Sequence, residues 1–238
     1  MKVSVEVDVI NRRVGLLFGV LFLGSSVMAS FGVSAETIRL VDSTGEAMKN
    51  MVVYLQPKHL VGFHAERAGE RVGNQALPLE VLQKNKQFSP YITVMQQGHE
   101  LRFVNDDDIT HHIYAAAGPK RFSLKLRKDK VTKTMVFDRV GHVSMGCNVH
   151  DWMSGHLLVV DTPYFGLTDD TGWVNLDSVP DADYTLVIWH PQLLSQDNTV
   201  SQEVTLPLPQ ALTITVSAAM GDIPYQKSLD DFEFLEGY

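Results

Sequence analysis

Short runs of β-branched, aliphatic and aromatic residues recur along this 238-residue chain, each followed by a turn signal. Examples are TIRLV, MVVYLQP, YITVM, ELRFVN, KTMVFDRV and YTLVIWHP. Turns such as Gln97-Gly98 separate them, and several runs alternate apolar with polar residues, as half-buried antiparallel strands do. No long stretch has the helical period, although NQALPLEVLQKNK is ambiguous and has room for a helical turn. We therefore expect an all-β fold built from sandwiches.

The N-terminus has the order of features that is typical of a secretory signal peptide. Arg12 and Arg13 precede an apolar run at residues 14–29, and Val33-Ser34-Ala35 is a small-residue cleavage signal. The run is shorter than the ~20 apolar residues that a spanning helix needs, which favours a cleaved leader over a membrane anchor. We expect cleavage after Ala35, a periplasmic location and no stable membrane insertion afterwards.

The exported chain is acidic. The whole chain has 20 Lys and Arg against 28 Asp and Glu, and the leader accounts for three and two of these, which leaves a net charge of −9. Such a chain is a poor candidate for binding nucleic acid or an anionic membrane. Its length is enough for one or two domains, each with its own core.

The chain has a single cysteine, Cys147, in the segment VSMGCNVHDWMSGHLLVV. No intramolecular disulfide is possible, so in an exported protein this thiol is reactive or a ligand. His150 follows three residues later and Met153 three residues after that. One thiolate, one or two imidazoles and a weakly held thioether form the ligand set of a mononuclear blue-copper site. The fourth ligand must come from a distant strand, and FVNDDDITHHIY offers His111 and His112.

Each of these residues also has a purely structural interpretation. A lone cysteine or methionine often belongs to a core, and His111 could lie on the surface beside Asp106-Asp107-Asp108, a run typical of a solvated loop. A Cys-His protease pair is disfavoured because no helix is expected to begin at Cys147 and lower its pKa. Zinc would accept the thiolate and the imidazoles, but methionine is a poor zinc ligand, which favours copper.

These residues resemble the cupredoxins, the family of plastocyanin and amicyanin. Asn105 stands six residues before His111, as a strand-ending Asn precedes the first ligand in that family, and Cys-x-x-His-x-x-Met is the short loop of amicyanins. QFSPYITVMQQGHELRFVN is similar to the strands before that ligand. The resemblance implies a cupredoxin-like Greek-key β-sandwich with one mononuclear type 1 copper on His111, Cys147, His150 and Met153.

The similarity extends over most of residues 36–195. KQFSP, FDRVG, GCNVHDWM, DTPYF and VIWHP resemble exported proteins labelled methylamine utilization proteins, a plastocyanin-like group. His112 takes a position that a non-ligand holds in cupredoxins. Two residues depart from the pattern, because His142 stands upstream of Cys147 where an apolar residue is expected, and His156 follows the loop. Either would change the polarity around the site without replacing a ligand.

Two further segments flank the copper-binding one. Residues 36–57 carry a D-x-x-G turn and residues 167–190 a V-P-x-x-x-Y-x-L pattern, and both resemble a small carboxypeptidase-regulatory-like (prealbumin-like) β-sandwich. We infer that a cupredoxin is inserted into this sandwich; the alternative is that the first segment is an extra cupredoxin strand. The expected organisation is a signal peptide at 1–35, first strands of the regulatory-like sandwich at 36–75, a cupredoxin domain at 76–162, the rest of the regulatory-like sandwich at 163–205 and a loosely held tail at 206–238.

The resemblance implies a protein that transfers single electrons between redox partner proteins in the periplasm and that is not an enzyme. Electrons would pass through the exposed edge of His150, with Trp152 and Met145 in an apolar docking patch. The alternative is a copper carrier that delivers the ion to an exported protein. A third possibility is an interaction protein whose metal site is vestigial. Reversible oxidation favours the first reading, and easy loss of Cu(I) to a chelator favours the second.

Overall fold

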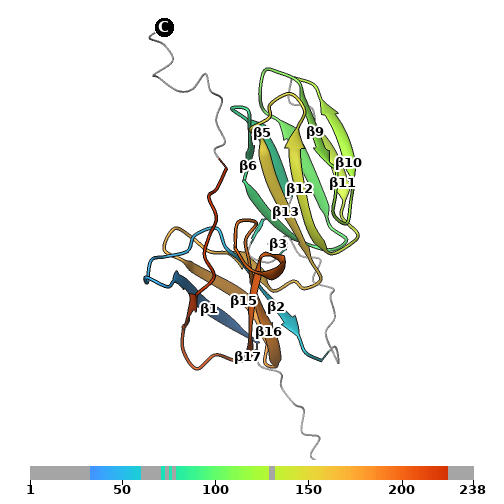
Figure 1. Ribbon diagram of the computed structural model, residues 1–238. Coiled ribbons are helices and arrows are strands. Elements are labelled where there is room, and N and C mark those ends of the chain that lie inside the picture. The colour runs from blue at the N-terminus through green and yellow to red at the C-terminus, as the bar shows by residue number, and fades with distance from the viewer. Residues whose placement is uncertain (1–32, 60–70, 73–74, 77–78, 129–131, 225–238) are drawn as a thin grey trace, which may run out of the picture. The chain divides into compact units, whose positions relative to one another are not determined.

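The computed structural model describes residues 33–59, 71–72, 75–76, 79–128 and 132–224 (Figure 1). Within these ranges the regular structure is β-strand, apart from the single 3-10 turn η1 (Gln196–Asn198). The predicted all-β class is confirmed. No helix in the described part is long and apolar enough to cross a membrane. The predicted leader lies almost wholly outside the described residues, and β1 (Val33–Asp42) begins at its end.

Two sheets contain the segment that we expected to bind copper. One has the strand order β10-β9-β12-β13-β7 and the other the order β11-β8-β5-β6. Apolar side chains of both, such as Phe103 and Ile113, form one buried cluster, so the sheets make a sandwich, which we call the first sandwich. Its strands are β5 (Leu79–Lys84), β6 (Gln87–Ser89), β7 (Ile92–Gln96), β8 (Glu100–Asn105), β9 (His111–Ala115), β10 (Phe122–Leu126), β11 (Thr132–Val136), β12 (Gly141–Cys147) and β13 (Ser154–Val160).

A second sandwich is built from strands that precede and follow the first one in sequence. Its sheets have the orders β15-β1-β18 and β14-β2-β16-β17, and side chains such as Leu40, Leu55 and Leu186 form its core. The remaining bounds are β2 (Val52–Pro57), β14 (Phe165–Leu167), β15 (Trp173–Pro180), β16 (Asp183–Trp189), β17 (Thr199–Thr205) and β18 (Leu212–Val216). The paired two-residue strands β3 (Arg71–Val72) and β4 (Gln75–Ala76) belong to neither sandwich.

Two stretches differ from what the sequence suggested. The ambiguous residues 74–86 contain β5 instead of a helical turn, and the inward side chains of β5 include Val81. Asn85 and Lys86, both at positive φ, turn the chain into β6. Strand β18 falls within the segment that we expected to be a loosely held tail. It is hydrogen-bonded in parallel to β1 and buries Ile214 and Val216.

A third apolar cluster contains residues of both sandwiches. Ile92 and Leu158 of the first sandwich pack in it with Val52 and Trp189 of the second. Four fully or nearly fully buried aliphatic and aromatic side chains in one cluster join the two cores by the same apolar burial that holds each core together.

Candidate metal centre

Strand β9 sends two adjacent histidines to opposite faces of its sheet. Successive residues of a strand point to opposite sides, and burial alternates along β9 from its first residue. His111 is 0% exposed. His112 is partly exposed, and its Nε2 lies 2.6 Å from the Ser123 hydroxyl of β10. The structure therefore places His111 in the interior and His112 outside it.

Strand β12 ends at Cys147, beside His111. Because β12 pairs with β9, Cys147 stands opposite Ile113, and its Sγ lies 3.7 Å from Nδ1 of His111. The chain then turns, and the N–H of Met153 donates to the carbonyl of His150 at 3.0 Å. This turn brings Nδ1 of His150 to 3.9 Å from the same Sγ. Cys147 is 4% exposed and His150 is 8% exposed.

The three donor atoms fit a metal ion. They lie within 4.8 Å of one another, and in the described part of the chain they form the one such group of three His, Cys, Asp or Glu side chains. Two ligands bound at about 2.0 Å through nitrogen and about 2.3 Å through sulfur, at roughly 120°, stand about 3.7 Å apart. The separations of 3.7 and 3.9 Å thus match a trigonal set of one thiolate and two imidazoles.

Hydrogen bonds stabilise the ionised form of Cys147. Burial raises the pKa of the thiol, but hydrogen bonds with His111, with the backbone and with His150 outweigh burial and lower the pKa to about 6. The N–H of Val149 contributes at 3.5 Å from Sγ. No helix begins at Cys147, as expected, and these hydrogen bonds lower the pKa in place of a helix. A thiol of this kind is largely ionised at neutral pH, and the thiolate is the form that binds metals.

Asp107 contacts Nε2 of His111, the ring nitrogen that does not lie next to Cys147. Its Oδ2 lies 2.7 Å from Nε2 of His111, and its two carboxylate oxygens also accept the backbone N–H groups of Asn85 and Lys86 at 2.6 and 3.0 Å. Burial acts to lower the pKa of His111, but Cys147 and Asp107 outweigh it and raise the pKa. A proton on Nε2 leaves the Nδ1 lone pair for a metal. We expected this acidic run to be a solvated loop; for Asp107 that is wrong.

Asn105 fixes the loop between β8 and His111. It is fully buried, and its side-chain amide donates to the carbonyls of Ile109, Leu126 and Arg127 at 2.7, 3.1 and 3.0 Å. Its Oδ1 accepts the N–H of Asp107 at 3.0 Å. One side chain thus connects the end of β8, the loop that carries Asp107 and the end of β10. The spacing from Asn105 to the first histidine therefore has a structural cause.

Met153 lies inside the first sandwich. It is 1% exposed and belongs to the same buried cluster as Cys147. The thioether is thus held in the interior by the loop that also carries His150. Its role as the axial ligand stays a prediction.

The surface next to this loop differs from the expected docking patch. Met145 is buried, because it stands two residues before Cys147 on β12 and so shares its inward face; its place in an exposed patch was wrong. Val149, which we did not single out, is 53% exposed. Trp152 is half-buried; its ring centroid lies 5.2 Å from that of His150.

His142 and His156, two histidines outside the predicted ligand set, contact each other. Nε2 of His142 lies 2.9 Å from Nδ1 of His156, and Nε2 of His156 lies 3.0 Å from the hydroxyl of Tyr91. The His142 ring also packs on Trp189 of the second sandwich. Burial, followed by the charges of His142 and His190, lowers the pKa of His156 to about 4. Both rings belong to the contact between the sandwiches and lie outside the ligand cluster.

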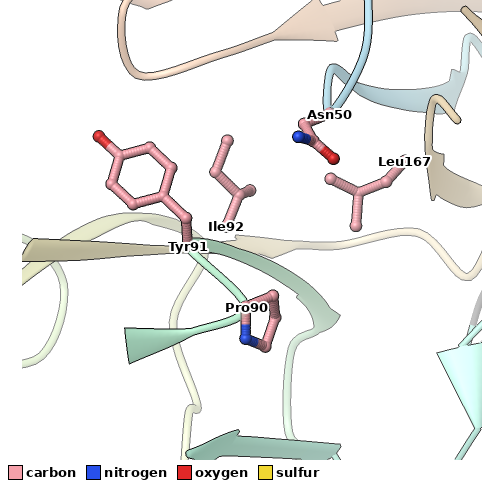
Figure 2. Close-up of a pocket in the computed structure, with 5 residues that line it drawn as sticks. All are labelled: Asn50, Pro90, Tyr91, Ile92 and Leu167. Carbon is pink, nitrogen blue, oxygen red and sulfur yellow. The ribbon is translucent and has the colours of Figure 1, made fainter. Parts of the chain in front are cut away.

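A cavity of about 240 Å³ lies between residues of the two sandwiches. Figure 2 shows its lining residues, which are Asn50, Pro90, Tyr91, Ile92 and Leu167. None of the predicted ligands lines it. Tyr91 is the one ionisable side chain among the five, and burial raises its pKa.

No family model matches the sequence, and no curated protein matches it. Among solved structures, a copper-containing nitrite reductase from Thermus scotoductus SA-01 is 22% identical with a TM-score of 0.34; the match covers 44% of this chain and 27% of the reductase. A purple cupredoxin from Nitrosopumilus maritimus is 21% identical with a TM-score of 0.32, and the match covers 34% of this chain and 99% of the purple cupredoxin. A Cu(I) form of an amicyanin mutant is 15% identical with a TM-score of 0.32, and the match covers 45% of this chain and 99% of that amicyanin. At these values the function must be inferred from the ligand cluster itself.

Proposed function

We propose that this protein binds one mononuclear type 1 copper ion and carries single electrons. His111, Cys147 and His150 would hold the ion through two imidazoles and a thiolate, and Met153 would add a weakly bound thioether. The observation that carries the proposal is the buried cluster of one thiolate and two imidazoles at 3.7 and 3.9 Å. Copper, when bound there, would supply a one-electron couple between its +1 and +2 states.

The donor set favours copper over zinc. Structural zinc sites take four Cys or His ligands, whereas here the described residues offer three such donors and a buried methionine on the same loop. Soft thiolate and thioether sulfur favours Cu(I), and imidazole accepts both copper oxidation states. A site with this mixture is suited to an ion that changes its charge by one.

The surrounding residues keep the ligands in place. Strand pairing fixes Cys147 relative to β9, and Asp107 fixes the ring of His111 and its tautomer. Ligands held on a hydrogen-bonded sheet keep their positions when the charge of the site changes, which lowers the cost of electron transfer. Burial of all three donors also favours electron carriage over copper delivery, since a delivered ion must be reached by the ligands of another protein.

Electrons would enter and leave near His150. It lies beside the exposed Val149 and the half-buried Trp152, so a partner that docks on this apolar surface comes close to a ligand. We propose redox partner proteins in the periplasm, because the leader predicts export and the acidic balance disfavours nucleic acid and anionic membranes.

Voltammetry of the copper-loaded protein, residues 36–238, tests this function. A reversible one-electron couple with unchanged copper content after many cycles is expected. A Cu(I) chelator should remove copper slowly. Rapid loss of Cu(I) to the chelator, with no reversible couple, would assign the protein to copper delivery.

A further inference from the structure

Basic residues are distributed unevenly along the chain. Residues 119–139 contain eight of the 20 Lys and Arg and two Asp, whereas residues 140–226 contain ten Asp and Glu and no Lys or Arg. A segment with a net charge of +6 therefore occurs in a chain whose net charge is −8. Such a concentration of one sign of charge creates a local field that differs from the field of the whole molecule.

The basic segment forms two edge strands of the first sandwich. β10 is the last strand of one sheet and β11 is the last strand of the other, and the two lie side by side in Figure 1. β10 runs antiparallel to β9, with Lys125 opposite His112 and Leu126 opposite His111. The end of β10 thus lies at the ligand end of the sandwich, where the amide of Asn105 holds the Arg127 carbonyl.

Four exposed cations gather at this end: Lys125, Arg127, Lys128 and Lys133. We call them the basic patch. None of them forms an ion pair within the part of the chain that the structure describes. Lys133 belongs to it because it pairs with Phe103, two residues before the end of β8.

The acidic groups nearby do not cancel the patch. Asp106 is paired with Lys84 at 3.2 Å, and Asp107 is bound to His111. Asp108, in the loop before β9, and Asp151, in the loop after β12, are exposed. Among the residues that the structure describes, the ligand end therefore has four exposed cations and two exposed carboxylates.

The patch adjoins the loop that carries His150. The N–H of Asn148 donates to the carbonyl of His112 at 2.9 Å, so the loop begins on the strand next to β10. Lysines on edge strands also prevent strand-to-strand aggregation. That role does not account for Arg127 and Lys128, which follow the last paired residue of β10.

We propose that the basic patch docks the acidic face of a redox partner protein, beside the apolar surface of Val149 and Trp152. This inference rests on the proposed electron-carrier function and names the chemical class of its partner. Opposite charges speed the encounter and orient it, and the apolar surface then makes close contact next to His150. The partner must present carboxylates around an apolar centre.

Electron transfer from the Cu(I) protein to hexacyanoferrate(III), a trianion, tests the patch. The copper ion loses one electron and the iron gains it, so no other reactant is needed. Rates are measured by stopped flow from about 10 mM to about 500 mM ionic strength. The expected rate for the unmodified protein falls as salt rises, although the protein and the oxidant are both negative overall. Poly-glutamate added at low salt should slow this reaction.

The chain offers a matched pair of variants. Arg127→Glu/Lys128→Glu changes the ligand end of the two strands, and Arg121→Glu/Arg139→Glu changes the opposite end by the same charge; all four residues are exposed. The first variant should lower the low-salt rate by roughly tenfold and lose the effect of poly-glutamate, while the second should change the rate less than about twofold. Equal effects of the two variants would overturn the proposal.

Two further outcomes would assign the patch to other occupants and so overturn it. Cosedimentation with phosphatidylglycerol vesicles that Arg127→Glu/Lys128→Glu abolishes would identify an anionic lipid surface. Concentration-dependent self-association that the same variant abolishes would identify a second copy of this chain. Failure of the proposed function is distinguishable, because the unmodified protein would then show no copper couple and no reaction with the oxidant.

Discussion

At the scale of single residues, the side of a strand on which a residue lies decides its chemistry. His111 and His112 are neighbours in sequence, yet one lies 3.7 Å from the cysteine sulfur and the other contacts a serine hydroxyl. Successive residues of a strand point to opposite faces, so only one of the two histidines can face the interior, and the resemblance to cupredoxins, through the spacing from Asn105, implied His111.

Replacement of each histidine in turn tests this register. His111→Ala removes one of the three proposed strong ligands and should abolish the blue copper spectrum, whereas His112→Ala should leave it largely intact because that ring points outward. Visible spectra of the two variants after addition of Cu(II) give the comparison. The opposite pattern would show that the register is shifted by one residue.

Asp107 gives a second prediction. Its carboxylate makes the imidazole of His111 a stronger donor, which stabilises Cu(II) more than Cu(I). Asp107→Asn should therefore raise the reduction potential and weaken Cu(II) binding by about 10–100-fold. Voltammetry and copper titration measure the two effects, with the exposed Asp108→Asn as control. Equal potentials and affinities in the two variants would exclude a role for Asp107.

Met153 gives a third prediction. Met153→Leu removes the thioether at a similar volume, which cores tolerate at under ~1.5 kcal/mol. The variant should stay folded and coloured with a raised potential, because loss of a donor disfavours Cu(II), and Met153→Gln should lower the potential through its oxygen. Identical potentials in both variants and the unmodified protein would remove Met153 from the site.

At the scale of elements, the sequence predicted what depends on local pattern and missed what depends on distant turns. The strands and the inward face of β9 follow from alternation, and the resemblance to amicyanins implied the short loop after Cys147. The role of Asp107 does not, because it depends on the turn at Asn85 and Lys86, about 20 residues earlier, whose N–H groups bind the carboxylate. Met145 and Cys147 are two residues apart on β12, so alternation places both on the inward face. The expectation that Met145 is exposed disregarded this pattern.

The position of β18 also depends on a part of the chain that is distant in sequence. Its residues were recognised as a β run, but their position after a Pro-containing stretch suggested a tail. Pairing with β1 is a contact across about 170 residues of sequence, and no local pattern specifies such a partner.

At the scale of the whole molecule, the contact between the sandwiches contains histidines whose pKa is lowered by burial in the folded state. An unfolded chain takes up a proton on His156 near its ordinary pKa of about 6.5, whereas the folded protein does so only near the lowered pKa of about 4. The unfolded state therefore binds more protons between these values, and folding stability falls as pH is lowered from about 6.5 to about 4.

His156→Gln should make this loss of stability smaller, because the side chain no longer titrates. Urea unfolding of both proteins at several pH values from about 7 to about 4 measures how the free energy of unfolding of each depends on pH. The exposed His59→Gln serves as control and should retain the full dependence. If the stability of His156→Gln depended on pH as strongly as that of the unmodified protein, His156 would not be the group whose titration destabilises the contact between the sandwiches.

The central claim is that the Cys147 thiolate binds copper, and the absorption spectrum of the protein after addition of Cu(II) tests it most directly. The account predicts an intense visible thiolate-to-copper band and a paramagnetic Cu(II) signal. The band should be lost in Cys147→Ser, even where copper remains bound, and retained in Ser144→Ala, an exposed residue of the same strand. A colourless copper complex of the unmodified protein, or a band that survives in Cys147→Ser, would contradict the claim.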